Sequence, residues 1–218
     1  MDLYITQNSF YFVHRHFIKF FLNKKSEIIY VKEKKRGLIK KYFEIIKNIG
    51  FFNTIYCCFC EVYFFVLLYD KYSKLKFQKI NDGDLNTVLE EKIRSENIKR
   101  IFSIGCPCKI NSDLQDQFKI NIYNLHGGII PFQKGRFSPI KGLKVKHKYL
   151  GASLYLISDT FDEGSLISQD YFKVVGKNVL VNYNKVLEIS SELLDNFLNG
   201  NTKKLPKFIF DSLNKTNY

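Results

Sequence analysis

An amide and an imidazole follow the same short apolar stretch of this chain. Asn124 and His126 come directly after residues 120–123, in the sequence NLHGG. We expect that stretch to be a strand of an α/β sheet, and such sheets bind ligands at the carboxyl ends of their parallel strands. An Asn amide can donate a hydrogen bond to a developing oxyanion, and a protonated His can do the same or transfer a proton. Taken alone, the pair also fits an ordinary turn.

A carboxylate that could interact with the imidazole occurs later in the sequence. Asp159 and Asp162 belong to the turn DTFDEG between the apolar stretches Ala152–Ser158 and Ser165–Val174. A carboxylate beside a His favours the imidazolium form and orients the ring, although Asp and Gly also favour turns for backbone reasons alone. Amide, imidazole and carboxylate together suit acyl transfer without a covalent enzyme nucleophile. The chain has no G-x-S-x-G elbow, Walker loop or G-x-G-x-x-G fingerprint, which argues against hydrolase, NTPase and dinucleotide-binding functions.

The elements that must position these residues alternate between strands and helices. Strands are expected at Leu3–Thr6, Glu27–Val31, Ile101–Ile104 and Ile120–Tyr123. Helices are expected up to about Leu22, over Gly37–Ile49, from Asp82 or Asp84 with the apolar face Leu85, Val88, Leu89 and Ile93, and from Asn111 or Ser112 to near Phe118. Such alternation predicts the α/β class with a mostly parallel sheet.

The second half of the chain predicts an antiparallel addition to that sheet. The turn between Ala152–Ser158 and Ser165–Val174 is short enough to join two antiparallel strands. A last helix is expected from about Val181 to Asn199, ending at Gly200. We therefore expect one domain over residues 1–200 and a C-terminal tail over residues 201–218.

The segment Phe51–Tyr69 is apolar over most of its 19 residues. Asn53, Thr54 and Glu61 interrupt it, and its aromatic residues are spread along its length instead of gathering at its ends. We expect a buried helix or a helix docked on the protein surface, not one inserted in a membrane. A membrane contact and a homodimer interface remain alternatives for this segment.

Composition and charge set outer limits on function. The chain has 218 residues, of which 45% are hydrophobic and 25% charged, as in ordinary globular proteins. The net charge of +13 suits small polyanions such as nucleotides or polyglutamylated cofactors, but no zinc-finger or RNA-binding signature accompanies it, so we do not expect nucleic-acid binding. The five cysteines suit apolar packing in a reducing cytoplasm, and neither a metal site nor a signal peptide is expected.

Six elements occur in the order of a known family core. They are Asn124-Leu125-His126, Ile129-Ile130-Pro131, Gly135, Gly151-Ala152-Ser153, the DTFDEG turn from Asp159 to Gly164, and Gln169. With these elements the chain resembles the formyltransferases that use 10-formyltetrahydrofolate. The resemblance implies a Rossmann-like α/β core with a mostly parallel sheet, an antiparallel strand pair near the C-terminal half and helices on both faces.

The resemblance also implies roles for individual residues. Asn124, His126 and Asp162 match the catalytic trio of the family. Main-chain groups near Cys108, Lys109 and Ile110, and in the loop that includes Ile157 and Asp159, match those that hold the folate, and no metal is implied. The chain departs from many relatives in having Gly127-Gly128 in place of Pro-Ser.

Features that the chain lacks reduce the number of candidate molecules that could accept the formyl group. We expect neither the C-terminal RNA-binding domain of methionyl-tRNA formyltransferases nor the N-terminal regulatory domain of formyltetrahydrofolate hydrolases, because only a tail is expected after Gly200 and the first strand is expected at Leu3. The loop Thr6–Ser9 lacks the glycines with which glycinamide ribonucleotide formyltransferases bind phosphate. The remaining likeness is to sugar N-formyltransferases, which act on nucleotide-linked amino sugars. It implies a cytoplasmic bacterial enzyme of O-antigen or lipopolysaccharide biosynthesis, with the glycinamide ribonucleotide enzyme and a catalytically silent, membrane-associated binding protein as alternatives.

Overall fold

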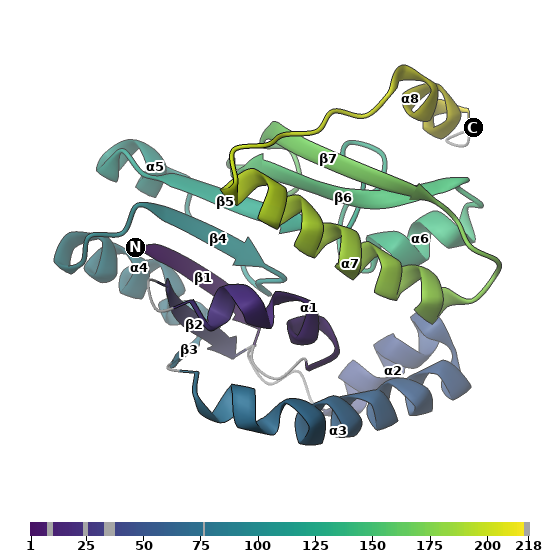
Figure 1. The fold of residues 1–218 in the computed structure, drawn as a ribbon, viewed down its shortest axis with the longest axis horizontal. Helices are drawn as coiled ribbons and strands as arrows, with labels where there is room; N and C mark the ends of the chain where they lie inside the picture. Colours follow the sequence, from purple (N-terminus) through teal and green to yellow (C-terminus); the bar gives the residue numbers. More distant parts are fainter. Residues whose placement is uncertain (8–10, 24–25, 33–37, 76, 216–218) are drawn as a thin grey trace. The chain divides into compact units, whose positions relative to one another are not determined.

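The computed structural model describes residues 1–7, 11–23, 26–32, 38–75 and 77–215. Within this part of the chain, strands form one sheet of seven in the order β3-β2-β1-β4-β5-β6-β7, with helices on both faces (Figure 1). The chain divides into two compact units, Met1–Tyr123 and Asn124–Tyr218. The α/β class expected from the sequence is confirmed.

Four strands lie wholly within the described part of the N-terminal unit, and they pair in parallel. They are β1 (Asp2–Gln7), β2 (Ser26–Lys32), β3 (Phe77–Asn81) and β4 (Arg100–Ile104). β1 pairs in parallel with both β2 and β4, and β2 pairs in parallel with β3. The run Leu3–Thr6 is buried without interruption, as in a parallel strand that is covered on both faces. β3 was not expected, because only Ile80 of its five residues is buried and an edge strand leaves little hydrophobic pattern.

Helices cover both faces of these strands. The chain moves in one direction along the sheet from β1 to β2 and in the other from β3 to β4. Right-handed crossovers then place α1 (Tyr11–Phe21) and α4 (Leu85–Ser95) on opposite faces, as Figure 1 shows. α4 buries Leu85 and Leu89, two members of its predicted apolar face. A short helix, α5 (Asp113–Phe118), precedes β5, and Asp82–Asp84 form a 3₁₀ turn before α4.

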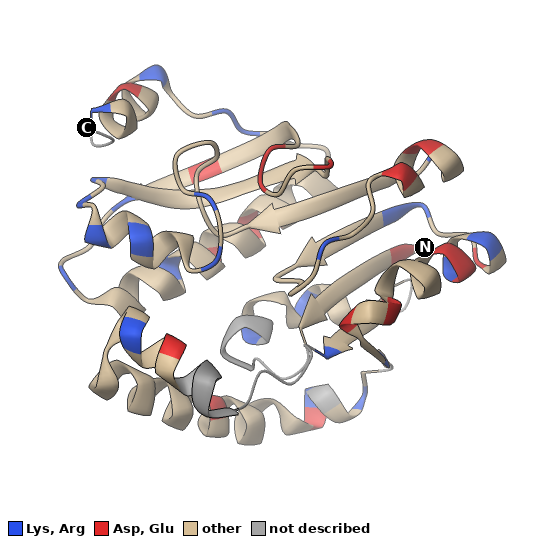
Figure 2. Cartoon of the chain, turned by 180° about the vertical axis from the view of Figure 1, so that it is seen from behind, with Lys and Arg blue, Asp and Glu red and all other residues tan. Residues whose placement is uncertain are grey.

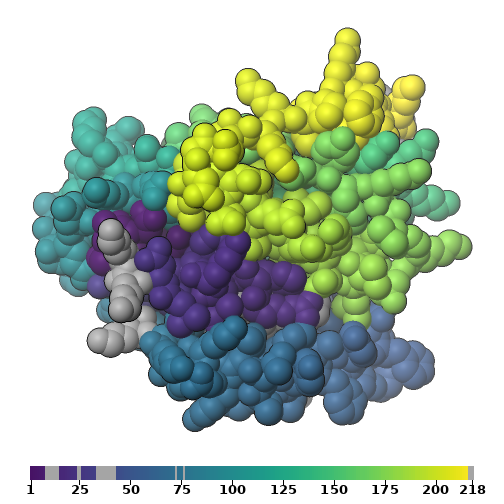
Figure 3. Space-filling view, in the orientation of Figure 1, coloured from purple at the N-terminus to yellow at the C-terminus, as the bar shows by residue number. Residues whose placement is uncertain are grey.

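A helical hairpin stands between β2 and β3 in the chain. α2 (Leu38–Ile49) is joined at Gly50 to α3 (Phe51–Ser73), and α3 packs against α1 and α2. Figure 3 shows the blue atoms of α3 on the surface of the unit. Among the described side chains of α3 only Thr54 is buried, so of the two expected alternatives the buried helix is wrong and the helix docked on the protein surface is confirmed. α3 is long and apolar enough to cross a membrane, judged by length and composition alone.

The C-terminal unit is built on an antiparallel pair. β5 (Asn121–His126) runs from one unit into the other, and β6 (Tyr149–Leu156) pairs antiparallel with β7 (Ser165–Lys173), as expected. α6 (Ser138–Lys144) and α7 (Val179–Leu198) pack against β6. The side chain of Asn178 caps α7 by accepting hydrogen bonds from the amides of the second and third helical residues.

The segment expected to be a tail contains a further helix. α8 (Lys207–Asn214) buries Ile209 and Leu213 completely, in a cluster with Ile129. The partly buried rings of Phe132 and Tyr149 pack against the same cluster. A helix of eight residues with two apolar anchors carries too weak a pattern to be predicted, because its stability comes from this packing.

Candidate functional site

Asn124 and His126 form the C-terminal end of β5. The strand runs through His126, three residues beyond the expected end at Tyr123. Alternate residues of a strand share a face of the sheet, so the two side chains project to the same side. Asn124 is half-buried, and the His126 side chain is 11% exposed. The pair therefore lies at a strand end, as expected, but within regular structure and not in a turn.

Asp162 approaches His126 from the loop between β6 and β7. Its Oδ1 lies 3.5 Å from Nδ1 of His126, and its side chain is 10% exposed. The other carboxylate oxygen, Oδ2, accepts a hydrogen bond of 2.6 Å from the amide of Gly135. The backbone φ of Asp162 is +56°, in the left-handed region that Asp tolerates better than most residues. This local conformation places the carboxylate beside the imidazole.

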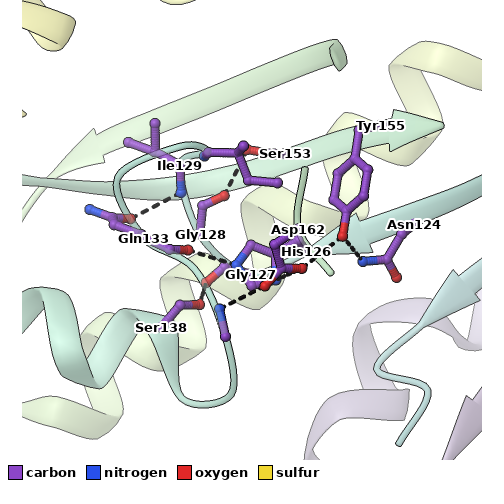
Figure 4. Close-up of polar contacts among 12 residues, drawn as sticks. Asn124, His126, Gly127, Gly128, Ile129, Gln133, Ser138, Ser153, Tyr155 and Asp162 are labelled. Atoms are coloured by element: carbon purple, nitrogen blue, oxygen red, sulfur yellow. Dashed lines mark hydrogen bonds and ion pairs between the residues drawn. The ribbon is translucent and has the colours of Figure 1, made fainter. Parts of the chain in front are cut away.

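Tyr155 joins Asn124 to Asp162, a connection that the sequence did not indicate. Its hydroxyl donates to Oδ1 of Asp162 at 2.7 Å and accepts from Nδ2 of Asn124 at 2.5 Å (Figure 4). Burial, followed by the hydrogen bond to Asp162, raises the pKa of Tyr155, so the hydroxyl remains protonated and keeps its donor role. Because that proton goes to Asp162, the hydroxyl must accept from Asn124, which fixes the orientation of the amide.

The second ring nitrogen of His126 faces the main chain. Nε2 lies 2.7 Å from the carbonyl oxygen of Gln133, and a carbonyl can only accept a hydrogen bond. Nδ1 faces the carboxylate of Asp162, which is also an acceptor. Both ring nitrogens therefore face oxygen atoms of other residues. Nε2 thus has the shorter contact, at 2.7 Å, and Nδ1 the longer one, at 3.5 Å.

The side chain of Gln133 fixes the loop that carries this carbonyl. Gln133 is 3% exposed. Its Oε1 accepts from the amide of Ile129 at 3.1 Å, and its Nε2 donates to the carbonyl of Tyr149 at 2.8 Å. Nε2 also lies 3.0 Å from Nδ1 of the buried His147. Gln133 thereby positions its own main chain against His126, a role that no feature of the sequence indicated.

Steric crowding in this loop explains why glycine occurs at position 128 of the Gly127-Gly128 pair. A Cβ on Gly128 would overlap the carbonyl oxygen of Gln133 and would lie 2.8 Å from Oγ of Ser138 and 2.9 Å from Nε2 of His126. A Cβ on Gly127 would lie 3.2 Å from a methyl group of Val186 and 4.0 Å from the ring of Pro139, the second of which is an ordinary contact. Gly128 is therefore needed for the contact between His126 and Gln133, and Gly127 is the more replaceable of the two.

Ser153 and Gln169, two elements of the matched pattern, hold the following part of the same loop. Oγ of Ser153 donates to the carbonyl of Gly128 at 2.7 Å and accepts from the amide of Ile130 at 3.1 Å. Nε2 of Gln169 donates to Oγ of Ser153 and to the carbonyl of Ile130, both at 2.8 Å. The peptide bond between Ile130 and Pro131 is cis. These matched residues support the loop and do not face the trio.

The residues expected to contact a folate lie in two separate segments. Ile157 and Asp159 belong to the same loop as Asp162, where Ile157 is half-buried and Asp159 exposed. Cys108, Lys109 and Ile110 belong to the N-terminal unit, in the loop between β4 and α5. Ile110 is buried there, and Lys109 is exposed. Their contact with a ligand stays a prediction.

Two cysteines in the loop after β4, Cys106 and Cys108, shift each other's pKa values in opposite directions. The sulfur atoms of Cys106 and Cys108 are 3.7 Å apart. The hydrogen bond from the thiol of Cys106 lowers the pKa of Cys108. The same hydrogen bond, with burial as the second cause, raises the pKa of Cys106 well above its ordinary value. Over the described residues, no group of three or more His, Cys, Asp or Glu side chains could hold a metal ion.

Solved structures with the same arrangement of elements are formyltransferases. Phosphoribosylglycinamide formyltransferase from Streptococcus pneumoniae TIGR4 matches with a TM-score of 0.61 at 11% identity, over 91% of this chain and 97% of that one. A 4-N formyltransferase from Francisella tularensis matches with a TM-score of 0.57 at 16% identity, over 94% and 72%. A sugar N-formyltransferase from Shewanella sp FDAARGOS_354 matches with a TM-score of 0.56 at 14% identity, over 94% of this chain and 73% of that one.

This chain has the formyltransferase fold. No protein-family model matches its sequence, and no curated protein is similar to it in sequence. At these identities the formyltransferase fold is established by structure, while the reaction and its substrates have to be argued from the residues of the site.

Proposed function

We propose that this protein is a formyltransferase, which transfers the formyl group of 10-formyltetrahydrofolate to a primary amine. The observation that carries the proposal is the proximity of Asp162 to the end of β5, where its carboxylate lies 3.5 Å from His126 and is joined to Asn124 through the hydroxyl of Tyr155. Asn124, His126 and Asp162 belong to the matched pattern, and their geometry provides donors and a carboxylate without a nucleophilic Ser or Cys. The formyltransferase fold supports the same reaction.

The chemistry follows from the hydrogen-bonding state of each side chain. The neutral amine of the acceptor attacks the formyl carbon, and a C–N bond forms while negative charge develops on the formyl oxygen. Asn124 has a second amide proton beside the one given to Tyr155, and a rotation of the His126 ring away from Asp162, 3.5 Å from Nδ1, would direct an N–H of Nδ1 toward the oxygen. A preorganised donor such as the amide of Asn124 stabilises the transition state strongly, because it needs no reorganisation during the reaction.

The proton balance assigns a further role to Asp162. The attacking amine must lose one proton, and N10 of the folate must gain one as the bond between N10 and the formyl carbon breaks. Before the reaction the carboxylate of Asp162 favours the imidazolium form of His126; it then accepts the amine proton directly or through water, and that proton passes to N10 as the bond to the formyl carbon breaks. Hydrogen bonds from the hydroxyl of Tyr155 and the amide of Gly135 hold the carboxylate of Asp162 in its position.

The folate binds through main-chain groups in this proposal. The residues assigned to it are Ile157 and Asp159 in the loop before β7, and Cys108, Lys109 and Ile110 in the loop after β4. Contacts through the main chain explain how unusual side chains such as Cys108 are tolerated. The reaction requires no metal.

For the acceptor we propose a nucleotide-linked amino sugar, a dTDP- or GDP-4-amino-4,6-dideoxy sugar. The absence of glycine from Thr6–Ser9 disfavours a substrate phosphate at that loop, and the net charge of +13 suits a nucleoside diphosphate. Solved relatives in fold include a sugar N-formyltransferase and a 4-N formyltransferase. The product would serve O-antigen or lipopolysaccharide synthesis in a bacterial cytoplasm.

Glycinamide ribonucleotide is the second candidate acceptor. It is favoured by the similarity in fold to phosphoribosylglycinamide formyltransferases, including one matched over 97% of its length. A single assay separates the candidates: the purified protein is given 10-formyltetrahydrofolate with each amino-sugar nucleotide or with glycinamide ribonucleotide, and release of tetrahydrofolate is followed. Turnover with an amino-sugar nucleotide is the expected result.

Site variants test the mechanism in the same assay. His126→Ala and Asp162→Asn should each lower kcat by about 10²–10³, the usual cost of one such group. Glu163→Gln is the matched control, since Glu163 is the neighbouring carboxylate and pairs with Lys134 on the surface. Near-full turnover by Asp162→Asn would contradict the proposed mechanism. Absence of both turnover and folate binding by calorimetry would favour the catalytically silent binding protein.

A further inference from the structure

The outward face of α3 is apolar and largely aromatic. The exposed large hydrophobic residues between the start of α3 and Tyr69 are Phe51, Phe52, Ile55, Tyr56, Phe59, Val62, Tyr63, Phe65, Val66, Leu67 and Tyr69. Phe52 is 84% exposed, Phe59 71% and Val66 69%. With helical geometry these residues cover an arc of about 200° around the helix axis. No Lys or Arg occurs from Phe51 to Asp70, and Figure 2 shows basic residues only at the C-terminal end of α3.

Thr54 and Glu61 of α3 lie on the opposite side, toward the rest of the unit, whereas Asp70 near its C-terminal end is exposed and pairs with Lys74. Thr54 is buried and donates to the carbonyl of Gly50 at 2.8 Å. Glu61 is half-buried and interacts electrostatically with Arg15 of α1, whose guanidinium lies 4.2 Å from the ring centroid of Phe64. A helix on a water-exposed surface has the reverse arrangement, with its polar side outward. The pattern indicates that an apolar medium covers the outward face of α3.

A groove continues this surface toward α2. It has a volume of about 470 Å³ and is lined almost entirely by apolar atoms. Its walls include Ile46 of α2 together with Ile55, Phe59 and Val62 of α3. The apolar surface therefore extends over parts of both α2 and α3. A surface of this width can contact an extended apolar partner such as a lipid layer.

The net charge of the first 80 residues favours a lipid surface over a second copy of the chain as the partner of α3. Residues 1–80 contain 15 Lys and Arg against six Asp and Glu, so they account for +9 of the net charge of +13. Lys19 of α1, Lys47 of α2 and Lys71 of α3 are exposed. Pairing two copies through α3 would bring two strongly positive units together, which is unfavourable. Anionic lipid headgroups complement this charge, and each basic residue near them adds to the attraction.

We propose that α3 docks this protein in the plane of an anionic lipid surface. The side chains of its outward face enter the boundary between headgroups and acyl chains, and the neighbouring lysines contact the headgroups. The helix does not cross the bilayer, because it packs along α1 and α2. Its exposed stretch of 19 residues is about 28 Å long. Aromatic residues suit this depth, since Tyr and Phe combine a large apolar surface with a tolerance for the interface.

Sedimentation of the full chain with vesicles tests the proposal. Vesicles of phosphatidylcholine alone are compared with vesicles that contain a quarter of phosphatidylglycerol. We expect strong binding to the second kind, weak binding to the first, and release by high salt, because exposed charges are screened. Release by alkaline carbonate is also expected, and retention after carbonate would overturn docking in the plane of the surface.

Two sets of variants identify the surface that binds. Replacing Phe52, Phe59 and Val66 together by Ser removes apolar area without changing charge or, to any large extent, helix propensity. It should lower the partition coefficient at least about a hundredfold. Replacing Val145, Val175 and Val181 by Ser, at exposed positions of the C-terminal unit, should leave it unchanged.

A charge variant and a mass measurement complete the test. Replacing Lys47 and Lys71 by Gln should weaken binding to anionic vesicles about fivefold for each lysine. Sedimentation equilibrium without lipid should find a monomer, and a dimer that the triple Ser variant dissociates would overturn the proposal in favour of a second copy. Equal vesicle binding by the triple Ser variant and its control would also overturn it. None of these readouts depends on formyl transfer.

Discussion

Replacing Gly128 by Ala is expected to displace the main chain that holds His126. The added Cβ would overlap the carbonyl oxygen of Gln133, the atom that accepts from Nε2 of His126 at 2.7 Å. That carbonyl has to retreat by about 1 Å before an ordinary C···O separation of about 3.3 Å is restored. Ser138 and His126 are crowded too, with 2.8 and 2.9 Å to the new atom, so no flexible side-chain end can absorb the whole change.

The magnitude follows from two independent effects. Overpacking a buried site of this kind costs about 1–3 kcal/mol of folding free energy, which is about 2–12 °C in thermal midpoint for a chain of this size. A displacement of about 1 Å at a catalytic group also costs about a hundredfold in rate. Thermal unfolding followed by circular dichroism measures the first effect, and kcat in the formyl-transfer assay measures the second.

The neighbouring glycine provides a matched control. The tightest contact of a Cβ on Gly127 is with a methyl group of Val186, at 3.2 Å, which can move by a few tenths of an ångström. Gly127→Ala should therefore change the free energy of unfolding by less than about 1 kcal/mol. If Gly128→Ala and Gly127→Ala prove equally stable and equally active, the steric account of this loop is refuted.

Three further predictions concern Tyr155, helix α8 and Cys108. Tyr155→Phe removes one hydroxyl and leaves an amide and a carboxylate oxygen each short of a partner, so kcat should fall about tenfold at unchanged KM; an unchanged kcat would argue against a positioning role. Leu213→Ala should cost about 2–5 kcal/mol of folding free energy, because the side chain is fully buried, whereas Asp211→Ala on the exposed side of α8 should be nearly neutral in thermal unfolding. Because the pKa of Cys108 is lowered, its thiolate is present at lower pH than usual, and the rate of alkylation by iodoacetamide should reach half its maximum below the pH of an ordinary thiol. Cys106→Ala removes the donor and should shift that midpoint upward, as read by peptide mass spectrometry.

The sequence by itself determined the elements whose patterns are local. The parallel strands β1, β2 and β4 and the antiparallel pair β6–β7 appear where apolar runs and short turns predicted them. The convergence of Asn124, His126 and Asp162 was also predictable, because the order and spacing of the motif place all three at the ends of neighbouring strands.

Only the tertiary structure decided how those residues are held. Tyr155 bridges two residues that are 31 and seven positions away, and no local pattern marks a strand tyrosine for this role. Gln133 and Gly128 acquire their importance from the close approach of one main-chain carbonyl to His126. α8 depends on packing against Ile129, and the exposure of α3 depends on which of its faces meets α1 and α2. Each of these features arises from contacts that exist only after the chain has folded, because hydrophobicity and spacing specify which residues are apolar but not which surfaces will be covered.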